Sequence, residues 1–253
     1  MNKFYNFLTK FEVSPFATIF IIFTLISNSY KLFFIYFLIT FIHELGHVLT
    51  ATLLKFKIGK IKLLAVGFNA EIEDLDNTSS LKEFLVVISG PLTYFISLYL
   101  LIYLYKIDFI SFNAYNQAMQ VNKYNLFFNL LPLIPLDGGR ILKIIIDNFF
   151  TSKKSMIVSV ILSNLFLVLF VYNTIDTPQW LIYIFLILTN LAYLLTINKR
   201  WKLFLLKRLM IKNNYKDRLH SKKDIYRNKN NYLIKNNIIL TEKEGILEIL
   251  KNK

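Results

Sequence analysis

Residues 32–54 read LFFIYFLITFIHELGHVLTATLL, an apolar run of membrane-spanning length that holds His43, Glu44 and His47. The run contains no Lys, Arg or Asp. Ionisable groups inside a membrane helix are costly to bury and usually mark a functional site. On a helix, histidines four positions apart share one face and can bind one metal ion, while the glutamate beside them can accept a proton. The run therefore predicts a membrane-spanning helix with the HExxH motif of a zinc hydrolase, and it points to a metalloprotease that works inside the bilayer.

The composition excludes an ordinary soluble domain. Of 253 residues, 55% are hydrophobic, and several uncharged stretches are long enough to cross a bilayer. The net charge is +14, and the segment 199–253 holds 16 Lys and Arg against 5 Asp and Glu. After a hydrophobic body, such a tail fits anionic lipid headgroups at the cytoplasmic face better than nucleic acid, which is not expected as a partner. The absence of Cys excludes a disulfide framework and thiolate metal ligands.

The gaps between charged residues predict an all-α membrane protein with six transmembrane helices and a broken fourth helix. The expected spans lie near 13–30, 32–54, 84–105, 117–148, 155–175 and 177–198. Residues 1–198 then form the intramembrane metalloprotease domain, and 199–253 form a basic cytoplasmic tail.

The loops between these spans predict an orientation in the membrane. Lysines gather at 55–62, at 151–154 and in the tail, which places both termini in the cytoplasm. Residues 57–73 alternate polar and apolar around Gly67, which predicts a β-hairpin on the cytoplasmic side; an irregular amphipathic loop is the alternative. The edge of this hairpin is a candidate for holding a substrate as an added strand. Near the end of the chain, Thr241 and the residues after it predict a short helix.

A third metal ligand is expected in the fourth span, because a catalytic zinc site normally has three protein ligands and a water molecule. The segment FNLLPLIPLDGGR at 128–140 contains two prolines and a glycine pair, so it predicts a broken helix. Asp137 lies in this break and is the candidate oxygen ligand; a pair between Asp137 and Arg140 at a kinked helix end is the alternative. Asp147 is a second acidic candidate, but it follows two basic positions and is expected at the interface.

Two features near the motif have open interpretations. Asn129 lies two turns before Asp137 and either donates to substrate or forms a hydrogen bond between helices. Ser89-Gly90-Pro91, inside the third span, is interpreted as close helix packing and a kink rather than chemistry. The alternative function is a membrane transporter or ion-binding protein that uses the broken helix 129–140. That alternative does not explain why His43, Glu44 and His47 have the spacing of an HExxH motif.

The motifs HELGH at 43–47, Ser-Gly-Pro at 89–91 and NLLPLIPLDGGR at 129–140 occur in a familiar order and spacing. In both respects the chain resembles the site-2 protease family of intramembrane zinc metalloproteases, and within it the stage IV sporulation protein FB group. The resemblance implies one zinc ion per chain, bound by His43, His47 and Asp137. It implies that Glu44 is the general base. It also implies that Asn129 and Pro135 bind substrate.

The resemblance also implies a cellular setting. It implies a multi-pass protein of a bacterial cell membrane that cuts a membrane-associated precursor and is regulated by other membrane proteins. In the sporulation group the substrate is a sigma-factor precursor. Many members end in a nucleotide-sensing CBS domain, but the segment 199–253 is too short for a full pair of such domains.

Overall fold

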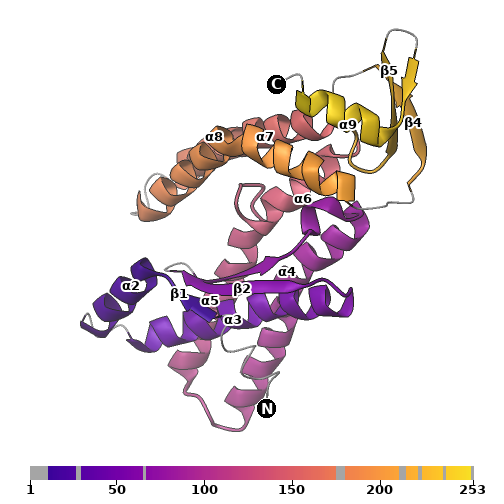
Figure 1. Ribbon diagram of the computed structural model, residues 1–253. Helices are drawn as coiled ribbons and strands as arrows, with labels where there is room; N and C mark the ends of the chain where they lie inside the picture. The colour runs from indigo at the N-terminus through magenta and orange to yellow at the C-terminus, as the bar shows by residue number, and fades with distance from the viewer. Residues whose placement is uncertain are drawn as a thin grey trace. The chain divides into compact units, whose positions relative to one another are not determined.

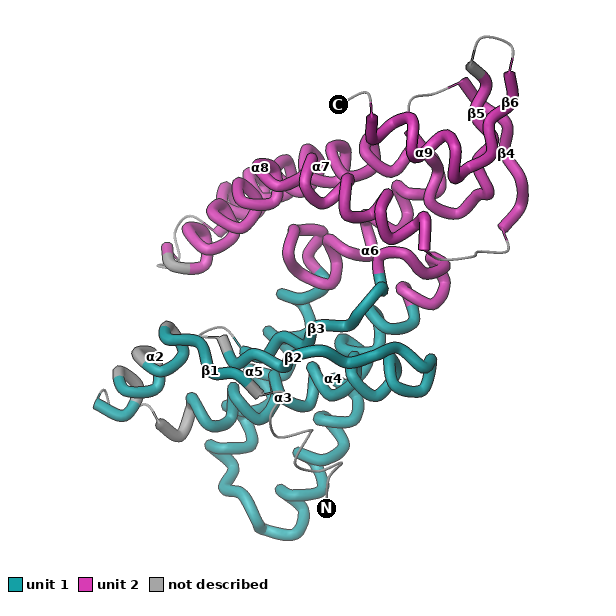
Figure 2. Tube along the Cα trace, in the orientation of Figure 1, with its two compact units in different colours: residues 1–75, 85–130 teal, residues 76–84, 131–253 magenta. Residues whose placement is uncertain are grey.

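The computed structural model describes residues 11–26, 30–64, 67–174, 180–210, 215–221, 224–235 and 238–251. The chain forms two compact units, which are coloured separately in Figure 2. Unit 1 comprises 1–75 and 85–130, and unit 2 comprises 76–84 and 131–253. Each unit is described by itself below, and the elements carry the labels of Figure 1.

Unit 1 combines helices with a small sheet. The strands of the sheet are β1 (Phe11–Val13), β2 (Ile58–Leu64) and β3 (Gly67–Ile72). β2 is the central strand, parallel to β1 and antiparallel to β3. The antiparallel pair confirms the strands of the predicted hairpin at 57–73. The sequence did not predict β1, because three residues are too few to show a strand period.

The helices of unit 1 are α2 (Pro15–Ile26), α3 (Tyr30–Leu53), most of α4 (Ser80–Lys106) and α5 (Phe112–Leu130). The hairpin packs on α3, where Phe68 of β3 contacts the rings of Phe37 and Phe41. α3 and α4 approach closely at Gly46, since a Cβ atom there would lie 2.5 Å from Thr93 Cγ2 and 2.7 Å from the Ser89 carbonyl oxygen. A glycine is therefore required where these two helices meet.

Unit 2 contains α6 (Asp137–Ile146), α7 (Ser152–Thr174), α8 (Trp180–Met210) and α9 (Glu242–Lys251). It also contains the sheet of β4 (Asp217–His220), β5 (Asn230–Lys235) and β6 (Ile238–Leu240). β5 is central, parallel to β4 and antiparallel to β6. Its apolar core joins α7 and α8 to the C-terminal elements and includes Val160, Trp201, Leu205, Ile225 and Ile246.

The C-terminal segment is folded. The predicted terminal helix is confirmed as α9, and a capping box begins it: the Thr241 N–H donates to Glu244 Oε2 at 2.8 Å, and the Glu244 N–H lies 3.5 Å from Thr241 Oγ1. The sheet before α9 was not predicted, because the Lys- and Asn-rich stretch has no clear two-residue alternation.

Four helices within the described part of the chain are long and apolar enough to span a membrane: Phe33–Leu53, Ser80–Lys106, Ser152–Thr174 and Ile182–Met210. The chain is thus a mostly helical, multi-pass membrane protein, and its described residues include two small sheets where the sequence predicted one hairpin. Two of the six expected spans, near 13–30 and 117–148, are not among these four helices. Within the described residues, α2 has 12 residues and ends at Ile26. The expected fourth span is broken, as predicted, between the end of α5 at Leu130 and the start of α6 at Asp137.

Candidate metal and catalytic site

The two histidines of the HExxH motif lie together on α3. Both are buried, and their Nε2 atoms are 3.2 Å apart. Two nitrogen ligands at about 2.05 Å from a tetrahedral zinc ion lie about 3.3 Å apart. The pair therefore already has the spacing of two ligands on one zinc ion.

The tautomer of His47 is set by a backbone group of α4. His47 Nδ1 lies 2.8 Å from the carbonyl oxygen of Val86. A carbonyl oxygen only accepts hydrogen bonds, so Nδ1 of His47 carries the proton and donates. The lone pair is then on Nε2, which is the atom turned toward His43. This is the ligand form of a neutral imidazole, held by an outer-shell contact.

Glu44 is held by the hairpin. The backbone N–H of Ala70 on β3 donates to Glu44 Oε1 at 2.6 Å. This contact fixes the orientation of a half-buried carboxylate one residue from His43. Sequence reasoning missed it because the donor is a backbone group, which leaves no mark in the residue type.

Gly90 of α4 makes room for the histidine pair. A Cβ atom at Gly90 would fall onto His47 Nε2 and would lie 2.8 Å from His43 Nε2. The neighbouring Ser89 Oγ lies 3.0 Å from the Gly46 carbonyl oxygen, so this part of α4 is also bound to α3. The sequence interpretation of Ser89-Gly90-Pro91 as packing is thus incomplete. Gly90 packs against the proposed ligand atoms themselves.

The expected third ligand, Asp137, begins α6 in unit 2. It is 9% exposed and lies at a helix N-terminus, where the helix dipole favours a carboxylate. In the irregular segment before Asp137, the backbone groups of Ile134 form hydrogen bonds with polar side chains of unit 2. The Ile134 N–H donates to Ser163 Oγ at 2.8 Å, and Asn190 Nδ2 donates to the Ile134 carbonyl at 2.7 Å. Because these hydrogen bonds satisfy backbone groups that lack helical partners, a broken helix is tolerated in a membrane protein.

The other acidic candidate has a different environment. Asp147 is 2% exposed and accepts from Lys143 Nζ at 2.9 Å, Arg227 at 2.9 Å and Ser155 Oγ at 2.5 Å. Its oxygens are therefore committed to an ion network within unit 2. Arg140, named above as an alternative partner of Asp137, has Glu83 Oε1 at 3.9 Å.

The two expected substrate-binding residues lie in different units. In unit 1, Asn129 Nδ2 donates to the backbone oxygen of Asn125 at 3.0 Å and lies 3.1 Å from Asn125 Oδ1. The amide nitrogen of Asn129 is thus directed back along α5 toward Asn125, and Oδ1 is the group it can present. Pro135 belongs to unit 2 and is exposed.

A membrane helix that carries an HExxH pair with ligand spacing, and a glutamate oriented beside it, defines a class: membrane-embedded proteins with a metal-hydrolase site. No protein-family model matches the chain. Stage IV sporulation protein FB of Bacillus subtilis is 32% identical over 155 residues, 61% of this chain and 54% of that protein. Zinc metalloprotease MJ0392 of Methanocaldococcus jannaschii is 35% identical over 127 residues, 49% of this chain and 37% of that protein.

A solved structure agrees with these relatives. The site-2 protease from Methanocaldococcus jannaschii has a TM-score of 0.51 and 25% identity, and the match covers 82% of this chain and 94% of that one. The chain is thus similar in fold to a solved site-2 protease, and part of its sequence is similar to a zinc metalloprotease and to a sporulation protein. It spans about half or less of the length of the two curated relatives.

Proposed function

We propose that the protein is an intramembrane zinc metalloprotease that hydrolyses a peptide bond within or near the membrane segment of a membrane-associated precursor. One observation carries the proposal: the Nε2 atoms of His43 and His47 lie 3.2 Å apart beside Glu44, on a helix of membrane-spanning length. The names of the relatives, a zinc metalloprotease and a site-2 protease, support it.

The metal implied by the family fits the residues present. His43 and His47 offer imidazole nitrogens and Asp137 a carboxylate oxygen, which are ligand types that zinc accepts. The fixed tautomer of His47 and the absence of a side chain at Gly90 support this assignment from unit 1. Zinc in such a site acts as a Lewis acid and lowers the pKa of a bound water toward about 7.

Glu44 supplies the proton transfers. Its carboxylate, oriented by the Ala70 N–H, accepts a proton from the attacking water and returns it to the leaving amine. The water oxygen forms a bond to the scissile carbonyl carbon, and the C–N bond breaks as the amine is protonated. The site therefore performs peptide hydrolysis with one carboxylate acting first as base and then as acid.

The outer edge of β3 is the proposed place for substrate. β2 lies between β1 and β3, so its backbone is already paired on both sides. Ala70 pairs with Ile61 of β2, yet its N–H points the other way, toward Glu44. Alternate residues of a strand point the same way, so an extended peptide added to this edge would lie beside Glu44.

Asn129 is proposed to hold the substrate backbone. Because its amide nitrogen is bound to Asn125, it presents Oδ1, an acceptor. It is therefore suited to accept a substrate N–H rather than to donate to a carbonyl. Pro135, exposed in the irregular segment before α6, is the second proposed contact.

The proposals on substrate, regulation and membrane topology rest on the similarity to the relatives and on the positions of the charged residues. A sigma-factor precursor as substrate is proposed from the similarity to a sporulation protein. Regulation by other membrane proteins and contact of the basic tail with anionic lipid headgroups are proposed with it. The six-span layout in a bacterial cell membrane, with both termini in the cytoplasm, is proposed from the distribution of lysines.

The native chain contains no Cys, so single cysteines test this topology cleanly. Cys placed at Gly59 and Asn230 should be protected from an impermeant thiol reagent in intact cells, whereas Cys at Asn113 should react. Reaction of the residue at position 59 from outside would reverse the orientation.

Co-expression with tagged single-span precursors tests the activity. Wild type should cleave a precursor, and Glu44→Gln should not, although the purified Glu44→Gln protein should still bind one zinc ion per chain. The substitution removes the base but keeps the three ligands and nearly the same shape. Cleavage by Glu44→Gln at the wild-type rate, or zinc-independent cleavage by wild type, would refute the assignment.

A further inference from the structure

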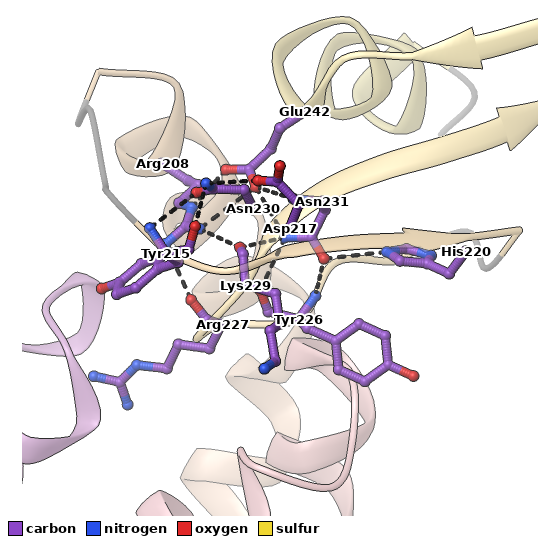
Figure 3. Close-up of polar contacts among 10 residues, drawn as sticks. All are labelled: Arg208, Tyr215, Asp217, His220, Tyr226, Arg227, Lys229, Asn230, Asn231 and Glu242. Carbon is purple, nitrogen blue, oxygen red and sulfur yellow. Dashed lines mark hydrogen bonds and ion pairs between the residues drawn. The ribbon is translucent and has the colours of Figure 1, made fainter.

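The C-terminal part of unit 2 contains a turn, Tyr226–Lys229, that is held from two sides (Figure 3). From α8, Arg208 donates to the carbonyl of Arg227 at 3.1 Å and to that of Lys229 at 2.7 Å. The same guanidinium pairs with Glu242 of α9 at 2.7 Å. The backbone of the turn is therefore bound to α8 directly, and to α9 through Arg208.

A buried asparagine holds the turn from the sheet. Asn231 of β5 is fully buried, and its Oδ1 accepts the Tyr226 N–H at 2.8 Å. Its Nδ2 donates to the carbonyls of Tyr226 and Lys229, both at 2.9 Å. With so many backbone groups satisfied, the turn has one defined conformation.

From this turn the side chain of Arg227 points away from the C-terminal sheet (Figure 3). It forms a buried ion cluster with Glu83 and Asp147. Its guanidinium lies 2.5 Å from Glu83 Oε2 and 2.9 Å from Asp147 Oδ2. It also donates to the carbonyl of Thr78 at 3.2 Å. Arg227, Glu83 and Asp147 are each at most 2% exposed.

The charges of this cluster depend on one another. Burial opposes the charge of Arg227, but Glu83 and Asp147 outweigh it and raise the pKa of the guanidinium above its ordinary value. Removing one partner from a buried ion cluster leaves an uncompensated charge and is strongly destabilising. Without Arg227, the carboxylates at the start of α4 and at the end of α6 would repel each other.

Within unit 2, the short helix α6 connects the cluster to the proposed ligand Asp137. α6 has 10 residues and begins with Asp137, and Asp147 is its C-cap. At helical rise the helix is about 15 Å long, and its backbone hydrogen bonds couple its two ends. Lys143 and Ser155 further fix Asp147 within unit 2. A displacement at the Asp147 end is therefore transmitted to Asp137.

We propose that Arg227 is a positioning residue for the metal site: through Asp147 it holds α6, and thereby the proposed ligand Asp137, in place. The inference rests on the ligand set given under the proposed function. It makes the C-terminal segment part of the enzyme's working structure. The sequence interpretation of that segment as a basic tail does not anticipate such a role.

Zinc affinity, measured by competition with a chelator, tests the proposal. Arg227→Met, which keeps side-chain length but not charge, should bind zinc about 10- to 100-fold more weakly, the usual cost of losing a supporting contact of a metal ligand. Arg227→Lys, which can pair with one carboxylate at a time, should recover part of the loss. The matched control is Arg218→Met, since Arg218 is exposed and stacks on the ring of Tyr226 in the same turn; it should bind zinc like wild type.

Two further readouts separate positioning from simple loss of fold. Trp201 is 1% exposed and donates to Asp224, so in a Trp180→Phe background its fluorescence reports whether unit 2 is folded. The visible spectrum of the cobalt-substituted protein reports the ligand set. Arg227→Met should keep the Trp201 signal but change the cobalt spectrum.

Three outcomes are decisive. If Arg227→Met and Arg227→Lys bind zinc with wild-type affinity and give the wild-type cobalt spectrum, the positioning role is wrong. If both variants lose the Trp201 signal together with zinc, Arg227 only stabilises the fold, and the proposal is equally wrong. If wild type itself binds no zinc, the proposed function fails first.

Discussion

Gly90→Ala is the sharpest perturbation of the histidine pair. The added Cβ atom would overlap His47 Nε2 and lie 2.8 Å from His43 Nε2, whereas ordinary van der Waals contact begins at 3.4 Å. To regain ordinary contact, the Nε2 atom of His43 must move by at least the difference between these two distances, 0.6 Å, and His47 must move further. Metal–ligand distances tolerate a change of only about 0.2 Å. The substitution should therefore disturb the ligands although it touches no charged or polar group.

The structure limits how the imidazoles can retreat. The ring of His47 is bound through Nδ1 to the carbonyl of Val86, one turn before Gly90 on the same helix. Moving the ring away from the new methyl group costs this buried hydrogen bond, about 1–3 kcal/mol. Moving α4 instead disturbs the contact between Ser89 and Gly46. We expect zinc affinity to fall about 10- to 100-fold, or about 1.4–2.8 kcal/mol.

The assay is zinc affinity of the purified protein together with thermal unfolding. Alanine is a better helix former than glycine by about 1 kcal/mol, so α4 itself should not be weakened. The matched control is Leu92→Ala, because Leu92 lies on the same helix with its side chain 51% exposed. It should leave zinc affinity unchanged. Wild-type zinc affinity in Gly90→Ala would refute the reasoning, because the histidine pair would then not occupy the space that Gly90 leaves.

Three further predictions concern the ligands, the hairpin and the C-terminal helix. Asp137→Ala should release zinc on dialysis. Asp147→Ala should weaken zinc binding only about as much as Arg227→Met does, and it should lower the unfolding temperature, since its partners are the charged groups of unit 2; wild-type zinc content in Asp137→Ala would move the third ligand elsewhere. Ala70→Pro removes the N–H bound to Glu44 and should slow cleavage with normal zinc content, while Ala70→Val should be silent; an equally active Pro variant would show that this donor is dispensable. Thr241→Ala removes the cap of α9 and should destabilise it by about 1 kcal/mol, seen as faster amide exchange in α9; unchanged exchange would contradict the capping role.

Much of the site could be predicted from the sequence because its key spacing is local. His43, Glu44 and His47 are neighbours on one helix, and helix geometry alone brings the two imidazoles to one face. The break before Asp137 is equally local, since prolines and glycines disrupt a helix wherever they occur. The alternation at 57–73 likewise predicted two strands, which the structure confirms as β2 and β3.

Only the tertiary structure decided what supports these residues. The Val86 carbonyl that fixes His47 is 39 positions away in the chain, and the Ala70 N–H that holds Glu44 is 26 positions away. Both are backbone groups, which every residue type carries, so no residue pattern reveals them. Arg227 looked like one more cation of a basic tail until the fold placed it 2.5 Å from Glu83, 144 positions earlier. Periodicity reports which face of an element is apolar, but the partner of a buried charge depends on how distant segments pack.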